Sequence, residues 1–213
     1  HRDMLSRPGN SRLPERHAII PFGHFAGKAV KPPVLDKDYR IVVLDNEVIS
    51  AYQRLPLSVV GDGRATIGEL INHKQEEFRR QGRDTQLDPN DFRIKMKLAR
   101  KKLNLQSVLP PNQKVFLLDC ANLSTGGEAI DVTGKIGPGF SKIAITLTRE
   151  MNLRYAGVDL MTIDPIETAK PQHYTILEIN AAPGLDHYAH LGEKQNRLVR
   201  DLYRKVLAAL KKG

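Results

Sequence analysis

The segment that most constrains the fold is residues 175–184, TILEINAAPG, which reads as an apolar strand ended by a Pro-Gly pair. It carries a carboxylate, Glu178, and a carboxamide, Asn180, two positions apart. Side chains alternate between the two faces of a strand, so we expect both groups on the same side. Two oxygen ligands on one rigid strand suit a hard cation such as magnesium.

A second apolar segment lies just upstream, at residues 156–161, and contains Asp159. Turn-prone residues 164–171 separate the two segments, which predicts an antiparallel hairpin. A hairpin folded about Thr168 and its neighbour places Asp159 opposite Glu178. Three oxygen ligands then converge at one place. The alternative is that the acid and amide at the end of the strand simply face solvent, and the spacing alone does not decide between the two.

Composition excludes several classes of protein. The 213 residues can bury a sizeable core in one or two domains, and they contain no apolar run of 18 residues that could cross a membrane. The N-terminus lacks the apolar core of a signal peptide. A single cysteine, Cys120, precludes an internal disulfide and favours a reducing cytoplasm. Cys120 ends the apolar segment 115–120, so we expect it to be buried.

The chain is basic, with a formal net charge of +9. The basic residues gather at 93–102 and 197–212, both of which read as amphipathic helices with their charges toward solvent. No RNP-like aromatic pattern and no zinc-ligand spacing accompany them, so we do not expect nucleic acid as the main ligand. A basic surface favours anionic small molecules.

The remaining pattern alternates hairpins with helices. Residues 39–45 and 47–54 predict a hairpin with a turn at Asp45-Asn46. Thr66 and Glu69 predict a capping box that opens a helix ending near Gly82. Further segments follow: a helix over 92–103, a strand from 115, a helix over 138–151 and a final helix with an apolar stripe over 198–210. We therefore predict the α+β class.

The order of these pieces resembles the ATP-grasp ligases, especially the branch with cyanophycin synthetase, bifunctional glutathione synthetase and ribosomal-protein glutamate ligases. The resemblance is dense from Asp38 to about residue 191. Each matching stretch is weak evidence by itself. The assignment rests on the stretches occurring in the same order as in the family. The matching stretches are residues 29–32, 38–44, 59–63 with 66–67, 121–127 with 131–133, 157–159 and 177–184.

The resemblance implies an ATP-grasp fold of antiparallel sheets flanked by helices. It also implies ligation of a carboxylate to an amine, in which ATP converts the carboxylate to an acyl phosphate that the amine attacks. Asp159, Glu178 and Asn180 are then expected to hold Mg²⁺, with Mn²⁺ as a second option. The expected substrates are amino acids or small peptides, and a homo-oligomer is left open.

Further roles are implied residue by residue. Arg40 is expected as a catalytic clamp on the acyl phosphate or substrate carboxylate, because a guanidinium pairs with such groups through two hydrogen bonds. Lys31 is expected to bind the phosphates of ATP. The expected substrate-binding residues are Arg54, Asn122, Gly126 and Gly127. The alternatives are structural salt bridges for the arginines, an exposed strand lysine and a plain Gly-Gly turn. Residues 186–190 are expected at the edge of the substrate or in a structural role.

The sequence departs from the family pattern between Lys31 and Arg40, where a glycine-rich lid and an adenine-contacting strand are expected. We expect residues 1–34 to be a remnant of the N-terminal part and lid subdomain, and residues 35–213 to be the C-terminal ATP-grasp subdomain with the metal site. Either lid residues are missing from this sequence near 27–36, or the chain is a short relic without ATP activity. The intact metal strand favours the first. A non-catalytic nucleotide- or peptide-binding module of the same fold is the alternative function.

Overall fold

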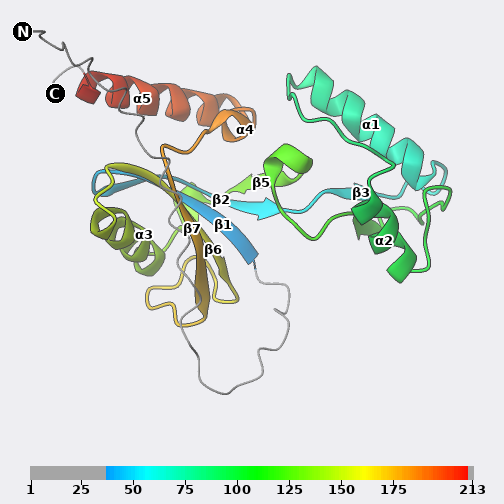
Figure 1. Ribbon diagram of the computed structural model, residues 1–213, viewed down its shortest axis with the longest axis horizontal. Helices are drawn as coiled ribbons and strands as arrows, with labels where there is room; N and C mark the ends of the chain where they lie inside the picture. Colours follow the sequence, from blue (N-terminus) through cyan, green and yellow to red (C-terminus); the bar gives the residue numbers. More distant parts are fainter. Residues whose placement is uncertain (1–36, 211–213) are drawn as a thin grey trace, which may run out of the picture.

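The computed structural model describes residues 37–210 and is built around one five-stranded antiparallel sheet (Figure 1). The strand order is β5-β2-β1-β6-β7. The strands are β1 (Lys37–Leu44), β2 (Glu47–Leu55), β5 (Glu128–Asp131), β6 (Tyr155–Thr162) and β7 (Tyr174–Ala181). The predicted α+β class and antiparallel sheet are confirmed.

Both predicted hairpins are present. β1 and β2 pair around a turn at Asp45, whose φ of 52° allows the tight reversal. β6 and β7 pair with Asp159 opposite Glu178, as the sequence predicted, and with a register irregularity just after Asp159. β1 also pairs with β6, so the two hairpins join at the centre of the sheet.

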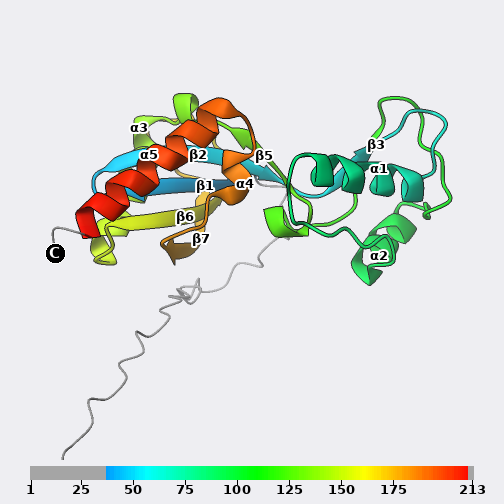
Figure 2. The same ribbon diagram turned by 90° about the horizontal axis from the view of Figure 1, so that it is seen from above.

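Helices cover both faces of this sheet. Helix α3 (Pro138–Glu150) packs Phe140 and Ala144 against one face. Helices α4 (Asp186–Ala189) and α5 (Glu193–Leu210) cover the opposite face (Figures 1 and 2). Val199 and Leu202 of the predicted apolar stripe are buried there. The strands alternate apolar residues between two cores, one under α3 and one under α4 and α5.

Residues 57–118 form a second body, the α1–α2 unit, which lies beside the sheet (Figure 2). It has its own apolar core. The predicted capping box at the start of its first helix is confirmed. The second helix ends at Arg100, three residues before the predicted end. The elements are β3 (Ser58–Val60), α1 (Ile67–Arg80), α2 (Phe92–Arg100) and β4 (Lys114–Phe116), with β3 and β4 paired as a two-stranded sheet.

The 122–127 loop, which contains the short 3-10 turn η1 (Leu123–Thr125), connects the α1–α2 unit to β5. A second such turn, η2 (Thr133–Lys135), follows β5. The expectation that Cys120 is buried in a strand is wrong. Strand β4 ends at Phe116, Leu117 and Leu118 take the last core positions, and Cys120 is exposed.

Some predictions fall outside the described residues. Lys31 and the matching stretch at residues 29–32 belong to this part of the chain, as does the predicted boundary after residue 34. Within residues 37–210, no helix combines the length and the apolar character that crossing a bilayer requires.

Candidate functional site

Four charged side chains form what we call the Arg–Asp cluster: Asp38, Arg40, Arg54 and Asp159. Asp159 is only 1% exposed and accepts hydrogen bonds from Nε and Nη2 of Arg40, each 2.6 Å long. Arg54 donates to Asp159 Oδ2 through Nη1 at 2.9 Å and to Asp38 Oδ1 through Nη2 at 2.7 Å. Each charge is therefore met by an opposite one.

Strand register explains why these residues meet. Arg40 of β1 lies directly opposite Asp159 of β6, and Asp38 of β1 lies opposite Arg54 of β2. Directly opposed residues on one face of an antiparallel pair have neighbouring side chains. Three adjacent strands thus bring together residues as far apart in sequence as 38 and 159.

Burial and pairing set the charges of the cluster. Burial raises the pKa of Asp159, but the hydrogen bonds and charges of Arg40 and Arg54 outweigh it, so this pKa lies below its ordinary value. For Asp38 burial outweighs the pairing with Arg54, and its pKa is raised. Burial disfavours the charge on Arg40, but its bonds to Asp159 more than compensate and raise its pKa. Arg40 and Asp159 are therefore a stable ion pair.

Glu178 and Asn180 lie on the edge strand β7, beside the Arg–Asp cluster. The Glu178 side chain is 53% exposed, and its Oε1 lies 3.6 Å from Nη2 of Arg40. The Asn180 amide donates to the same Oε1 at 2.9 Å. The two side chains project to the same side of β7, as strand alternation predicted, and they are close enough to act on one ligand.

These residues differ in how well they fit a metal ion. Both oxygens of Asp159 already accept hydrogen bonds from arginine, so in this arrangement it serves as a counter-charge. The Glu178 carboxylate is open to solvent and Asn180 is partly so, and Mg²⁺ typically uses one or two protein carboxylates together with waters and phosphates. Glu178 and Asn180 therefore fit a Mg²⁺ site. Among residues 37–208, no three His, Cys, Asp or Glu side chains are grouped to hold a metal by themselves.

A cavity of about 290 Å³ opens beside the cluster. It brings together three predicted site residues, Arg40, Arg54 and Asn122, with two members of the predicted edge segment, His187 and Tyr188. Burial, together with the nearby charge of Arg83, lowers the pKa of His187 and favours its neutral form. The remaining wall residues are Tyr52, Leu123, Ser124 and Gly184.

Gly126 and Gly127 are not in the cavity wall. The Gly126 N–H donates to Leu123 O at 3.2 Å, and the Gly127 N–H donates to Asn122 O at 3.0 Å. The N–H groups of both glycines thus close the turn of the 122–127 loop. Their assignment as substrate-binding residues rests on the family resemblance alone.

The sequence interpretation missed Tyr52. It lies opposite Arg40 in the β1–β2 hairpin and stacks on Tyr188, with ring centroids 5.1 Å apart. Strand alternation carries the signal that could have found it, because Tyr52 is two positions from Arg54 and so shares its face.

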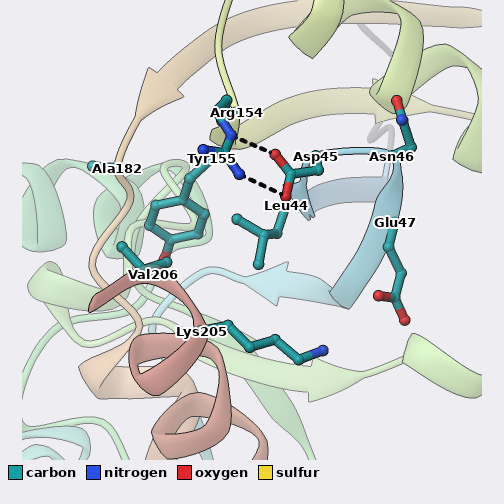
Figure 3. Close-up of a pocket in the computed structure, with 9 residues that line it drawn as sticks. All are labelled: Leu44, Asp45, Asn46, Glu47, Arg154, Tyr155, Ala182, Lys205 and Val206. Carbon is teal, nitrogen blue, oxygen red and sulfur yellow. Dashed lines mark hydrogen bonds and ion pairs between the residues drawn. The ribbon is translucent and has the colours of Figure 1, made fainter. Parts of the chain in front are cut away.

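A larger concavity of about 760 Å³ lies near the β1–β2 turn (Figure 3). Leu44, Tyr155 and Val206 give it an apolar floor, and Arg154 pairs with Asp45 across its rim at 2.7 Å. It contains none of the predicted site residues. Volume alone therefore does not identify the functional site, and the smaller cavity at the Arg–Asp cluster is the better candidate.

Comparison with known families points to the same region. Residues 120–198 match the model of the RimK-like ATP-grasp domain. This match contains the 122–127 loop, β6, β7 and α4, and therefore Asn122, Asp159, Glu178 and Asn180.

Curated relatives match most of this chain but only a small part of their own length. A glutathione biosynthesis bifunctional protein GshAB from Clostridium perfringens is 31% identical over 168 residues, which is 76% of this chain and 21% of the relative. A cyanophycin synthetase from Trichormus variabilis is 36% identical over 154 residues, which is 70% of this chain and 17% of the relative. The chain thus spans about a fifth of the length of these relatives.

A solved structure supports the fold. The crystal structure of a bifunctional glutathione synthetase from Pasteurella multocida superposes with a TM-score of 0.63 at 23% identity. The superposition covers 81% of this chain and 25% of that one.

Proposed function

Because the chain carries a RimK-like ATP-grasp domain, we propose that it catalyses an ATP- and Mg²⁺-dependent ligation of a carboxylate to an amine through an acyl phosphate. The observation that carries this proposal is one juxtaposition. The exposed Glu178 carboxylate lies 3.6 Å from the guanidinium of Arg40, which belongs to the wall of the cavity, and it accepts a hydrogen bond from Asn180 on the same strand. Glu178 and Asn180, which suit a cation, thus lie beside the fixed positive charge of Arg40.

Glu178 and Asn180 would hold the metal, which when bound neutralises charge on the phosphoryl group being transferred. Lys31, outside the described residues, would add a positive charge to the phosphates of ATP. Asp159 acts differently in this proposal. It holds the Arg40 side chain in one orientation and keeps it cationic.

Arg40 would steady the substrate carboxylate and the developing negative charge. The edge of its guanidinium formed by Nε and Nη2 already donates two hydrogen bonds to Asp159. The N–H groups that remain, two on Nη1 and one on Nη2, would contact substrate. A charge fixed before the reaction costs little reorganisation when the transition state forms.

Arg54 and Asn122 would bind the rest of the acid substrate, because both belong to the cavity wall. Relatives are named for glutathione and cyanophycin synthesis, so we propose amino acids or small peptides as substrates. The net charge of +9 favours anionic ones. The exposed single cysteine fits our further proposal of a reducing, cytoplasmic location.

The test is release of ADP from MgATP in the presence of a pool of amino acids. Glu178→Gln is expected to lower turnover at least about 100-fold, because it removes the open carboxylate that would hold the metal. Glu150→Gln is the matched control, because Glu150 is 70% exposed on α3 and should leave turnover unchanged. Wild-type turnover in Glu178→Gln would refute the site. Mg²⁺-dependent ATP binding without turnover by the wild-type chain would favour the rival function, a binding module.

A further inference from the structure

Arg83 connects the α1–α2 unit to the 122–127 loop. Its Nη2 donates to two carbonyl oxygens of the loop region, Leu123 O at 2.9 Å and Gly127 O at 3.1 Å. The two acceptors lie at opposite ends of the loop. One guanidinium nitrogen therefore ties both ends together from outside.

The end of helix α1 places Arg83 in this position. Gly82 has a φ of 70° and donates to Arg79 O at 3.0 Å, while the N–H of Arg83 donates to Phe78 O at 2.9 Å. This pair of bonds is a Schellman motif, which requires a residue with positive φ after the helix and so favours glycine. The motif brings the Arg83 guanidinium carbon to 3.8 Å from the centre of the Phe78 ring.

This arrangement leaves Arg83 little freedom to move. Its side chain lies between an aromatic ring and the loop, and its Nε is buried without a partner in the part of the chain that the structure describes. A buried, unpaired donor costs free energy, so the contacts of Nη2 and the ring must offset it. An exposed arginine without a ring contact and hydrogen bonds of this kind would not be held in one position.

The loop that Arg83 holds supplies part of the candidate site. Asn122, Leu123 and Ser124 line the same cavity as Arg40 and Arg54. A second link between the α1–α2 unit and this region is the ion pair of Lys74 with Glu128, which lies on β5 beyond the loop. Of these two polar links, Arg83 is the one that contacts the loop itself.

We propose that Arg83 is a positioning residue that holds the 122–127 loop, and with it Asn122 and Ser124, in place to bind substrate. The part of this inference that concerns substrate rests on the proposed function. The part that concerns the loop does not, and the two can be tested separately.

Hydrogen exchange measured by mass spectrometry on the full chain tests the hold on the loop. In Arg83→Ala the amides of residues 123–127 are expected to exchange at least about tenfold faster, the factor that matches loss of a hydrogen bond from a charged group. Arg79→Ala is the matched control, because Arg79 is in the last turn of α1, is 58% exposed and, among residues 37–208, forms an ion pair only with Glu76. It should leave loop exchange unchanged.

Arg83→Lys keeps the charge and most of the stem, so its loop should exchange at an intermediate rate. Loop exchange in Arg83→Ala within twofold of wild type would overturn the inference. If Arg83→Ala speeds exchange throughout the chain, the variant is destabilised as a whole and Arg83→Lys is used in its place. Loop exchange in Arg83→Lys is then compared with exchange of the α1 amides in the same variant. A loop that is protected as well as in wild type would overturn the inference.

Turnover tests the consequence for substrate. Arg83→Ala is expected to raise the amino-acid concentration for half-maximal ADP release about tenfold, because the misplaced loop weakens substrate binding. The concentration of MgATP for half-maximal turnover should change less than about twofold, and Arg83→Lys should restore part of the loss. Faster loop exchange with unchanged turnover would refute the substrate role alone. Absence of turnover in the wild-type chain would refute the proposed function, and the exchange experiment would still decide the loop.

Discussion

The five-stranded sheet and the α1–α2 unit differ in what they bury. In the sheet region two charged residues are almost fully buried, Arg54 and Asp159. In the α1–α2 unit the buried polar residues that the structure describes are neutral: Ser58, Gln75 and Thr85. Burying charge is costly unless each charge has a partner, so the stability of the sheet region depends on the pairing of these charges.

The two regions also satisfy their polar groups differently. Gln75 donates to Thr85 O at 3.1 Å and accepts from the Leu87 N–H at 2.6 Å, which fixes the segment after α1 by neutral bonds. Asp159 instead depends on two cations, Arg40 of β1 and Arg54 of β2. We therefore expect substitution and acid to act strongly on the sheet region and weakly on the α1–α2 unit.

The largest effect is expected for Asp159→Asn. The substitution leaves Arg40 and Arg54 without their shared counter-charge, and breaking a buried pair in this way typically costs about 3–5 kcal/mol of unfolding free energy. Urea unfolding measures it. The control is Asp45→Asn, which breaks the exposed pair with Arg154 and should barely move the midpoint. If both variants unfold at the same urea concentration, the buried cluster does not stabilise the sheet.

Acid should weaken the sheet region through the same carboxylate. The pKa of Asp159 is lower in the folded chain than its ordinary 3.8, so its contribution to stability is present above that pH and is lost as the pH falls through the folded pKa. Asp38 has a raised pKa, and its protonation partly offsets this loss. Urea unfolding at several pH values below about 5 should show a steeper decline for wild type than for Asp159→Asn. Parallel declines would contradict the prediction.

Gly126 lies where the two regions meet, and Gly126→Ala tests that boundary. Its φ is 95°, and an added Cβ would lie 2.5 Å from Leu87 Cδ2 and 3.1 Å from Leu57 Cδ1. Strain of this kind together with overpacking should cost about 2 kcal/mol. Gly134→Ala is the control, because an added Cβ there meets nothing within 4 Å. Equal unfolding free energies of the two variants would show that the contacts around Gly126 rearrange at little cost.

Local patterns in the sequence were sufficient to predict the hairpins and the start of α1. Alternation along β6 and β7 and the turn between them determined that Asp159 faces Glu178, and Thr66 with Glu69 identified the helix start. These features depend on residues close in sequence or on the two strands of one hairpin, so they could be deduced without coordinates.

The contacts of the site could not be predicted in the same way. Arg40 and Asp159 are 119 positions apart, and their pairing depends on β1 lying next to β6, which no local pattern specifies. The sequence therefore predicted three equivalent metal ligands, whereas Asp159 is buried against arginines and Glu178 is open. The bond from Arg83 to the 122–127 loop was missed for the same reason, because it crosses between two bodies.

Within the α1–α2 unit, Thr66→Ala should have a moderate effect. Thr66 Oγ1 accepts the Glu69 N–H at 3.3 Å, and Glu69 accepts the Thr66 N–H at 2.8 Å. Loss of such a cap costs about 1 kcal/mol, and urea unfolding should detect it. Thr66→Ser keeps the hydroxyl and serves as the control. ADP release should stay at the wild-type level in both, because Thr66 is at the end of α1 opposite Arg83 and is not in the cavity wall. A large loss of turnover would show that the two regions are tightly coupled.

The smallest effect on stability is expected for Glu178→Gln, although this variant should lose the most turnover. Glu178 is 53% exposed and lies 3.6 Å from Arg40, so solvent screens the attraction and the unfolding free energy should change by less than about 0.5 kcal/mol. Urea unfolding of this variant beside Asp159→Asn compares two carboxylates that face each other across one hairpin. A loss as large as that of Asp159→Asn would mean that Glu178 is also a structural counter-charge. Stability retained with turnover lost would separate the carboxylate that supports the fold from the one that is free to bind a ligand.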